Sequence, residues 1–351
     1  MSRVVIAMSG GVDSSVAAAL LVDQGYDVVG IHMKLHDSTA QQAGRCCGTD
    51  DALDARQVAD TLGIPFHVMD LREAFKKAVI DDFVSTYAAG ATPNPCVQCN
   101  GVLKFRVLLQ RALALGASHL ATGHYARIGP GPTLLRATDT HKDQTYFLFP
   151  VTEKALQRTM FPLGGLTKEE VRAEAVRLGL VTADKPESQE ICFVEDGKHA
   201  GFVQEQLPEV DGAGEIVDEQ GRVLGHHEAY WRYTVGQRRG LGVAMGHPIY
   251  VSSIDPETRR VVVSGGEDLW HAGLVASGWT WNERPGPDEV VSARIRHKGA
   301  MSLCRVGPSD TPEIRFTEPV WAVAPGQAVV VYRGETVLGG GWIQKAIEGE
   351  A

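Results

Sequence analysis

The chain has 351 residues, of which 44% are hydrophobic and 22% are charged. This composition is typical of a globular protein, and the length predicts two or three domains. No apolar run reaches the ~20 residues that span a bilayer, and the N-terminus lacks the apolar core of a secretion signal. Six cysteines are too few for a disulfide scaffold in so long a chain. We therefore expect a cytoplasmic protein with reduced thiols and no membrane partner.

The formal net charge of −9 is unevenly distributed. Residues 187–228 hold eleven acidic and two basic residues, so the rest of the chain is neutral overall. Residues 100–142 carry six lysines and arginines against one acid, and residues 291–306 carry four against none. Basic clusters of this size suit the phosphates of a folded RNA. The charge distribution therefore favours an RNA partner that the net charge alone argues against.

Strand and helix signals alternate through the first half of the chain. A continuous apolar run predicts a strand buried on both faces at Val4–Ser9, and Tyr26–Met33 predicts a second buried strand. Further strands are predicted at Phe66–Leu71 and Ser118–Thr122. Helical periodicity lies between them, at Ser14–Gln24, Asp50–Leu62, Arg72–Tyr87 and Gly101–Leu115. This alternation predicts an α/β domain with an open parallel sheet.

After about residue 180 the helical pattern fades, and short β-rich runs separated by turn residues follow. These runs are Tyr230–Val235, Ile249–Ile254, Arg260–Ser264, Val290–Arg296, Ile314–Phe316, Val320–Ala322 and Ala328–Tyr332. They predict small all-β modules. We expect an N-terminal α/β domain over residues 1–200, a small central β-rich domain over 201–269 and a C-terminal β-barrel over 270–351.

The motif with the clearest chemistry is Ser9-Gly10-Gly11-Val12-Asp13-Ser14-Ser15, between the first strand and the first helix. A strand–glycine–helix junction turns backbone N–H groups and the positive end of the helix dipole toward an anion. Asp13 could hold a magnesium ion that bridges phosphates. The loop has neither the Gly-Lys-Ser/Thr ending of ordinary ATPases nor a dinucleotide GxGxxG. It therefore predicts a nucleotide site of another class.

Three cysteines lie in settings that suggest chemistry. Cys96 and Cys99 lie on a proline-stiffened loop, Thr92–Asn100, just before the predicted helix at Gly101, which would put Cys99 at a helix N-terminus, where the thiolate is favoured. Cys192 lies in the acidic segment Glu187–Val194. Two interpretations stay open. The three cysteines could ligate a metal or an iron–sulfur cluster, although a lone C-x-x-C is weak evidence for zinc, or Cys99 and Cys192 could hand over sulfur through a persulfide.

The glycine loop resembles that of the ATP pyrophosphatase superfamily, whose members cleave ATP between the α and β phosphates and adenylate a substrate oxygen. Along nearly its whole length the chain resembles the tRNA-specific 2-thiouridylases. The segments that carry this resemblance are Thr92–Asn100, Thr122–Arg127, Lys142–Leu148, Glu187–Val194, Tyr233–Gly242 and Leu338–Gly341.

The resemblance implies a sulfurtransferase that uses ATP and Mg²⁺ to adenylate the C2 oxygen of a tRNA wobble uridine. A cysteine persulfide then delivers sulfur to C2. By motif, Cys99 corresponds to the family nucleophile and Cys192 to the persulfide carrier, with a transient disulfide between them, and Asp13 belongs to the catalytic loop. A cysteine desulfurase or a sulfur-relay carrier would supply the persulfide. Cys96 stands where many members carry aspartate, which keeps the iron–sulfur interpretation open.

The resemblance also implies two sets of contacts. The ATP-contacting positions are Ala7, Met8, Ser9, Gly10, Gly11, Val12, Asp13, Ser14, Met33 and Gly123. The tRNA-contacting positions are Asn94, Pro95, Cys96, His124, Lys142, Asp143, Gln144, Arg296, His297 and Gln327.

Two alternatives of other classes remain. A small-molecule ligase or amidotransferase would share the glycine loop, but it would explain neither the cysteines nor the basic stretches. A non-catalytic RNA-binding protein with a relic nucleotide site is disfavoured by the intact loop and the paired cysteines.

Overall fold

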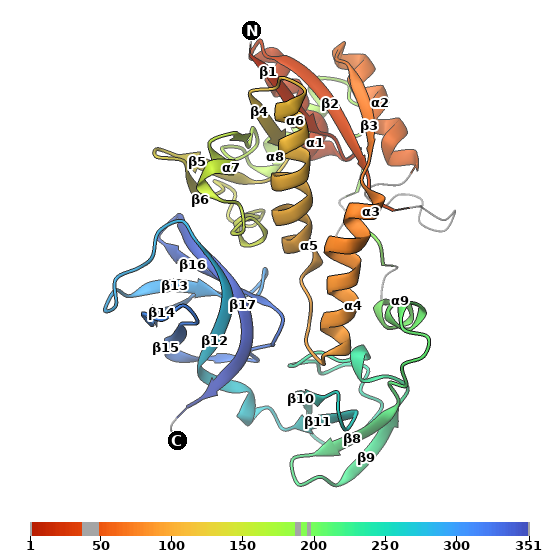
Figure 1. Cartoon of the computed structure of the whole chain (residues 1–351), viewed down its shortest axis with the longest axis vertical. Helices are drawn as coiled ribbons and strands as arrows, with labels where there is room; N and C mark the ends of the chain where they lie inside the picture. The colour runs from red at the N-terminus through yellow and green to blue at the C-terminus, as the bar shows by residue number, and fades with distance from the viewer. Residues whose placement is uncertain (1, 37–48, 187–190, 195–197, 350–351) are drawn as a thin grey trace. The chain divides into compact units, whose positions relative to one another are not determined.

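The computed structural model describes residues 2–36, 49–186, 191–194 and 198–349, and its chain forms two compact units (Figure 1). Unit 1 comprises residues 1–80, 96–195 and 335–337, and unit 2 comprises residues 81–95, 196–334 and 338–351.

Unit 1 is built on a five-stranded parallel sheet in the order β3-β2-β1-β4-β7. The strands are β1 (Arg3–Ala7), β2 (Asp27–Lys34), β3 (Phe66–Asp70), β4 (His119–Thr122) and β7 (Thr159–Met160). Ala7 at the end of β1 pairs with Ile31 on one side and Thr122 on the other. The strand order reverses between β1 and β4, and in such sheets ligands bind at the carboxyl ends of the strands at this point. The predicted parallel α/β sheet is confirmed.

Three helices pack with this sheet and form one apolar core with it. They are α1 (Val12–Asp23), α2 (Thr49–Leu62) and α8 (Lys168–Arg177), and α1 contacts both of the others. Fully buried Val16, Leu21 and Val58 pack with Val4 and Ile6 of β1 in one cluster. The small and branched side chains thus anchor α1 directly behind the glycine loop.

Two long helical runs follow, each interrupted by π-helix. The first consists of α3 (Arg72–Phe75), the π-helix η2 (Lys76–Ile80) and α4 (Asp81–Ala88). The second consists of α5 (Pro95–Gln98), the π-helix η3 (Cys99–Leu108) and α6 (Leu109–Ala114). The predicted start at Gly101 is therefore wrong, because Pro95 already occupies the first helical position, where its fixed φ and missing N–H are favourable.

The rest of unit 1 surrounds the end of β4. A hairpin of β5 (Ala126–Gly129) and β6 (Thr133–Arg136) is followed by the 3₁₀ turn η4 (Thr145–Phe147) and α7 (Glu153–Leu156). Thr336, in the short piece of unit 1 from late in the chain, pairs with Leu135 of β6.

Unit 2 contains a small sheet in the order β10-β11-β8-β9, from β8 (Gly214–Asp218), β9 (Val223–His227), β10 (Tyr250–Asp255) and β11 (Arg260–Ser264). Helix α9 (His199–Gln206) precedes it, and Tyr230–Arg232 form a 3₁₀ turn, η5. The predicted strand at Tyr230–Val235 is therefore wrong there. Its aromatic residues are buried for another reason: Trp231 fills space beside Gly212, and Tyr230 donates to the carbonyl of Ala88.

The last six strands of unit 2 form the predicted β-barrel, which is closed because β12 pairs with both β15 and β17. The strands are β12 (Trp270–Trp281), β13 (Val291–Arg294), β14 (Ser302–Val306), β15 (Glu313–Trp321), β16 (Ala328–Arg333) and β17 (Thr336–Glu348), after the 3₁₀ turn η6 (Glu267–Leu269). The two short runs predicted near residues 314 and 320 are the single strand β15.

Within the described ranges, no helix has the length and apolar character needed to cross a bilayer.

The two cores can be perturbed separately. Ile6 and Leu274 are both fully buried, the first in unit 1 and the second in the barrel, and truncation of such side chains to alanine costs about 2–5 kcal/mol of unfolding free energy. All six tryptophans lie in unit 2, whereas most helices lie in unit 1. In denaturant titrations we expect Ile6→Ala to lower the midpoint seen by far-ultraviolet circular dichroism more than that seen by tryptophan fluorescence, and Leu274→Ala to do the reverse. Equal shifts in both signals would contradict this expectation.

Candidate functional site

A cavity of about 290 Å³ opens at the carboxyl ends of β1, β2 and β4 in unit 1. Its walls come from the glycine loop, the ends of β2 and β4, helix η3 and the segment after β6. The lining residues are Ala7, Met8, Ser9, Gly11, Val12, Asp13, Ser14, His32, Met33, Asp51, Lys104, Thr122, Gly123, His124, Tyr125, Lys142, Gln144, Lys185 and Pro186. Nine of the ten positions expected to contact ATP are in this wall, and Gly10 shapes it from behind.

The glycine loop is fixed by close backbone approaches. Gly10 has a φ of 78°, and a Cβ there would overlap the carbonyl oxygen of Asp51. Gly11 caps α1 without any side-chain hydrogen bond, while the hydroxyls of Ser14 and Ser15 donate to its carbonyl. The first N–H groups of α1 are thus left to an anion in the cavity, as expected for a phosphate site.

Gly123 lets the end of β4 meet this loop. A Cβ at Gly123 would lie 2.8 Å from the carbonyl carbon of Asp13 and 2.8 Å from the nitrogen of Ser14. The glycine requirement at this position is therefore steric and is set by the loop backbone.

One end of the cavity is apolar. Met33 is 8% exposed, and buried His32 places Nδ1 2.9 Å from the carbonyl oxygen of Met8. Burial lowers the pKa of His32, an effect that its hydrogen bond to Met8 opposes. Since a carbonyl only accepts, Nδ1 carries the proton. This end suits a flat heterocycle, and sequence reasoning had identified Met33 but not His32.

Each carboxylate in the wall is matched by a lysine. The Lys168 ammonium lies 2.7 Å from Oδ1 of Asp13, which also accepts from the Tyr125 hydroxyl at 2.9 Å. Lys185 lies 2.6 Å from Asp51 and 2.5 Å from Asp54. Burial alone would lower the pKa of Lys185, but its hydrogen bonds to Asp51 and Asp54 outweigh burial and raise it. Sequence reasoning missed all these partners, because each lies far along the chain from the loop.

These carboxylates do not form a metal site of their own. In the part of the chain that the structure describes, no group of three or more His, Cys, Asp or Glu side chains could hold a metal ion. Cys96, Cys99 and Cys192 are all described and are not such a group, so the geometry does not fit the iron–sulfur interpretation. Cys46 and Cys47 lie outside the described residues.

His124 follows Gly123 in the cavity wall and is buried. Its Nδ1 is 2.7 Å from Oγ1 of Thr122, and its Nε2 is 3.4 Å from Nζ of Lys104. Burial, and then the nearby Lys104 charge, hold the pKa of His124 well below its usual range. The ring is therefore neutral at physiological pH, and its expected role as a tRNA contact stays a prediction.

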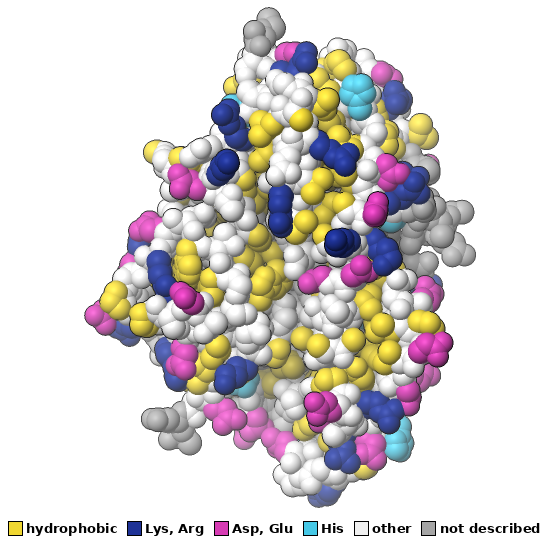
Figure 2. Space-filling view, viewed as in Figure 1, with side chains coloured by type: hydrophobic (Ala, Val, Ile, Leu, Met, Phe, Trp, Pro, Cys, Tyr) yellow, Lys and Arg dark blue, Asp and Glu magenta, His cyan; other side chains and the backbone are white. Residues whose placement is uncertain are grey.

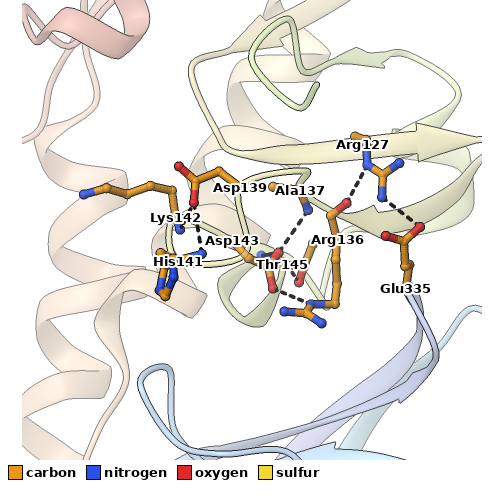
Figure 3. A network of polar contacts seen from close by, with 9 residues as sticks. All are labelled: Arg127, Arg136, Ala137, Asp139, His141, Lys142, Asp143, Thr145 and Glu335. Atoms are coloured by element: carbon orange, nitrogen blue, oxygen red, sulfur yellow. Dashed lines mark hydrogen bonds and ion pairs between the residues drawn. The ribbon is translucent and has the colours of Figure 1, made fainter. Parts of the chain in front are cut away.

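The loop from Asp139 to Thr145 is held by two carboxylates (Figure 3). Asp139 accepts from the backbone N–H groups of His141 and Lys142. The side chain of Asp143 is fully buried, where it pairs with Arg136 and accepts from Ala137 and Thr145. The expected tRNA contact at Asp143 is thus an interior side chain here. It fixes the loop that presents its neighbours Lys142 and Gln144 to the cavity.

The same hydrogen-bond network extends to residues 335–337, which belong to unit 1. Arg127 donates from Nε to the carbonyl of Arg136 and pairs with Glu335 at 3.0 Å (Figure 3). The backbone N–H of Arg136 in turn donates to the carbonyl of Glu335. The residues just before β17 are therefore tied to the hairpin beside the cavity.

The helix that begins at Cys99 and the neighbour of Cys192 contact the same element of unit 1, helix α3. Cys99 begins η3, which contacts α3, and Phe193, next to Cys192, packs edge-on against Phe75 of α3 at 5.4 Å. Both cysteines are half-buried, whereas Cys96 is exposed. Because the helical run begins at Pro95, Cys96 lies in its first turn and Cys99 one turn later. The helix-dipole argument made for Cys99 therefore applies better to Cys96.

The remaining expected tRNA contacts belong to unit 2. Asn94 and Pro95 are buried, and Gln327 donates from Nε2 to the carbonyls of Thr92 and Pro93 at 3.2 and 3.0 Å. Arg296 is exposed, and its Nη2 donates to the carbonyls of Trp321 and Ala322. His297 follows it and is half-buried. The side chains of Gln327 and Arg296 thus donate hydrogen bonds to backbone carbonyls of unit 2.

Lysine and arginine side chains are spread over the face of unit 1 that carries α3 and the run from η3 to α6 (Figure 2). Exposed cations here are Lys76 and Lys77 of the π-helix η2, which follows α3, and Arg106 of η3 and Arg111 of α6. A positive surface thus lies on the helices that bear Cys99.

Comparison with known families covers almost the whole chain. Residues 2–196 match the tRNA methyl transferase HUP domain, residues 200–265 the tRNA methyl transferase PRC-barrel domain and residues 271–343 the aminomethyltransferase beta-barrel domain.

Curated relatives agree on one activity. The chain is 50% identical to the tRNA-specific 2-thiouridylase MnmA of Geobacter metallireducens, over 98% of this chain and 97% of that one. It is 48% identical to the protein of the same name from Geotalea uraniireducens (98% and 96% covered) and 46% identical to that from Carboxydothermus hydrogenoformans (98% and 98%). Among solved structures, a 4-thiouridine synthetase–RNA complex with bound ATP aligns at 18% identity over 55% of this chain and 45% of that chain, with a TM-score of 0.34, too low to carry an argument.

The approach of Gly123 to the loop can be tested by adding one carbon. Gly123→Ala forces the backbone of Asp13 and Ser14 to move, so we expect nucleoside triphosphate affinity, measured by titration calorimetry, to fall about tenfold or more. Gly165→Ala is the matched control, because nothing lies within 4 Å of a Cβ there. Unchanged affinity in Gly123→Ala would show that the loop tolerates the displacement.

The buried neutral ring of His124 predicts a pH dependence of stability. The unfolded chain binds a proton at this histidine below its ordinary pKa, whereas the folded chain does not, so stability is lost as pH falls. Between pH 7.5 and 5.5 we expect wild-type unfolding free energy to fall by about 1 kcal/mol more than that of His124→Gln. Denaturant titrations at the two pH values measure the difference. Parallel losses in both proteins would mean that the folded ring takes up the proton.

Proposed function

The chain belongs to the tRNA-specific 2-thiouridylase family, and from this premise we propose that it converts the wobble uridine of tRNA to 2-thiouridine at the expense of ATP. The observation that carries the proposal is the cavity of unit 1, where a glycine loop built for phosphate and an apolar end face the helix that begins at Cys99.

The first step is adenylation. The uridine O2 attacks the α-phosphorus of ATP. The bond between this phosphorus and the α,β-bridging oxygen breaks, and pyrophosphate leaves. The N3 proton of the uridine passes to solvent. The uncapped N-terminus of α1 and the lysines of the wall support this step, because both would bind the phosphates. The adenine would lie at Met33 and His32. Magnesium carried by ATP would offset phosphate charge, with Asp13 and Asp51 as the wall carboxylates nearest to the loop.

The second step is sulfur transfer. The terminal sulfur of a Cys192 persulfide attacks C2, and AMP leaves. The Cys99 thiolate then attacks the sulfur of Cys192, so the S–S bond breaks and a Cys99–Cys192 disulfide forms. The transferred sulfur stays on C2, and N3 takes a proton back from solvent. An external thiol reductant supplies two electrons to reopen the disulfide. A protein persulfide donor, such as a cysteine desulfurase or a sulfur-relay carrier, reloads Cys192. The packing of η3 and Phe193 on α3 supports the pairing of the two cysteines.

We propose that tRNA is positioned by its phosphates and read at one extruded base. The exposed cations of η2, η3 and α6 support phosphate contacts by unit 1, and Arg294, Arg296, Lys298 and Arg305 support them in the barrel. An anticodon-loop base is already partly unstacked, so its extrusion costs only about a few kcal/mol. In this division of labour, unit 1 performs the chemistry and the barrel of unit 2 binds RNA.

The mechanism predicts the effect of three cysteine substitutions. We expect Cys99→Ser and Cys192→Ser each to abolish thiolation, because a hydroxyl neither carries nor releases sulfur, while ATP binding survives. The matched control is Cys304→Ala, since Cys304 is buried in the barrel and burial raises its pKa to about 12, which makes it an inert thiol. The measurement is 2-thiouridine in digests of unthiolated tRNA incubated with ATP, a cysteine desulfurase and cysteine. A serine variant that thiolates at the wild-type rate would refute the two-cysteine mechanism.

A further inference from the structure

Helix η3 carries a second functional group besides Cys99. Lys104 lies on the same π-helix, is half-buried and lines the cavity of unit 1. We propose that Lys104 is a catalytic residue that binds the α-phosphate of the nucleotide, and that His124 positions it. This assignment rests on the proposed function and adds to it the group that stabilises AMP as it leaves.

Lys104 differs from the two lysines that pair with carboxylates at the cavity. Lys185 is paired with two carboxylates, and Lys168 is paired with Asp13. The partner of Lys104 is the imidazole of His124, and no described carboxylate lies within ion-pairing distance of it. The ammonium of Lys104 is therefore not paired with a described carboxylate, and the ligand that the glycine loop in the same cavity wall fits is a phosphate.

His124 aims this ammonium. A protonated lysine only donates, so Nε2 of His124 accepts from Nζ, and Nδ1 therefore carries the proton that is donated to Oγ1 of Thr122. The ring is fixed by burial and by this hydrogen bond. Two N–H groups of Lys104 remain for oxygens of a ligand in the cavity.

The winding of η3 connects Lys104 with Cys99. In a π-helix hydrogen bonds join residues five apart, so residues 99 and 104 lie on nearly the same side, whereas in an α-helix they diverge. The α-phosphate is the one phosphate that must face both the nucleotide cavity and the sulfur chemistry, because it is bonded to the uridine oxygen that sulfur displaces. A cation on this side of η3 neutralises charge on the departing AMP.

The test compares two ligands that differ by this phosphate. Titration calorimetry gives the Kd of AMP and of adenosine for wild type, Lys104→Met, Lys104→Arg and the control Lys154→Met, an exposed lysine of α7 outside the cavity wall. We expect Lys104→Met to weaken AMP binding by about tenfold or more and to leave adenosine unchanged. Lys104→Arg should recover part of the loss, and Lys154→Met should bind both ligands as wild type does.

Two results would overturn the assignment: unchanged AMP affinity in Lys104→Met, or equal weakening of AMP and adenosine, which would indicate general damage to the cavity. Thermal unfolding of each variant checks folding, and Lys104→Arg keeps the comparison available if the methionine variant is unstable. The readout is independent of thiolation. A wild-type protein that binds AMP through Lys104 but thiolates no tRNA would refute the proposed function and leave the phosphate assignment intact.

Discussion

The site depends on one steric constraint: the backbone at the start of α2 and the backbone at the end of β4 both lie in close contact with the glycine loop. Gly10 lies against the carbonyl of Asp51 at the start of α2, and Gly123 lies against Asp13 and Ser14. These approaches bring the end of β4 and the start of α2 to the same loop, and with them the side chains of Thr122, His124 and Asp51. The order of the parallel sheet makes this possible, because β1 lies between β2 and β4.

Electrostatic pairing then organises what the backbone brings together. Lys168 pairs with Asp13 and Lys185 pairs with Asp51, so the cavity has partly buried ion pairs rather than isolated charges, which would be more costly. Entry of a polyphosphate alters this balance, since its oxygens compete with the two carboxylates for the lysines. Lys185 and Pro186 of the cavity wall directly precede the acidic segment Glu187–Val194, which contains Cys192. The charged wall of the cavity and the expected sulfur carrier are therefore close in sequence.

Sequence reasoning predicted the elements whose signals are local. Buried apolar runs identified β1 and β2, and the glycine loop identified the cavity, because both depend on neighbours in the chain. It failed where a partner is distant: nothing near Asp13 indicates Lys168, and nothing in Lys142-Asp143-Gln144 shows that the middle carboxylate points inward to Arg136. It also took the aromatic run at Tyr230 for a strand, since burial of Trp231 in a turn leaves the same pattern. The residue assignments for tRNA and the domain limits near 200 and 270 stay predictions.

The π-helical winding of η3 has a consequence for how this segment can vary. Hydrogen bonds in a π-helix join residues five apart. The four residues between Cys99 and Lys104 therefore set the angle between these two side chains around the helix axis as well as their distance along it. Deletion of one of them would restore α-helical spacing without moving the lysine far around the axis, whereas an insertion would turn it toward the opposite side. Change in length at this helix is therefore asymmetric: the segment can shorten and keep its two functional groups together, but it cannot lengthen.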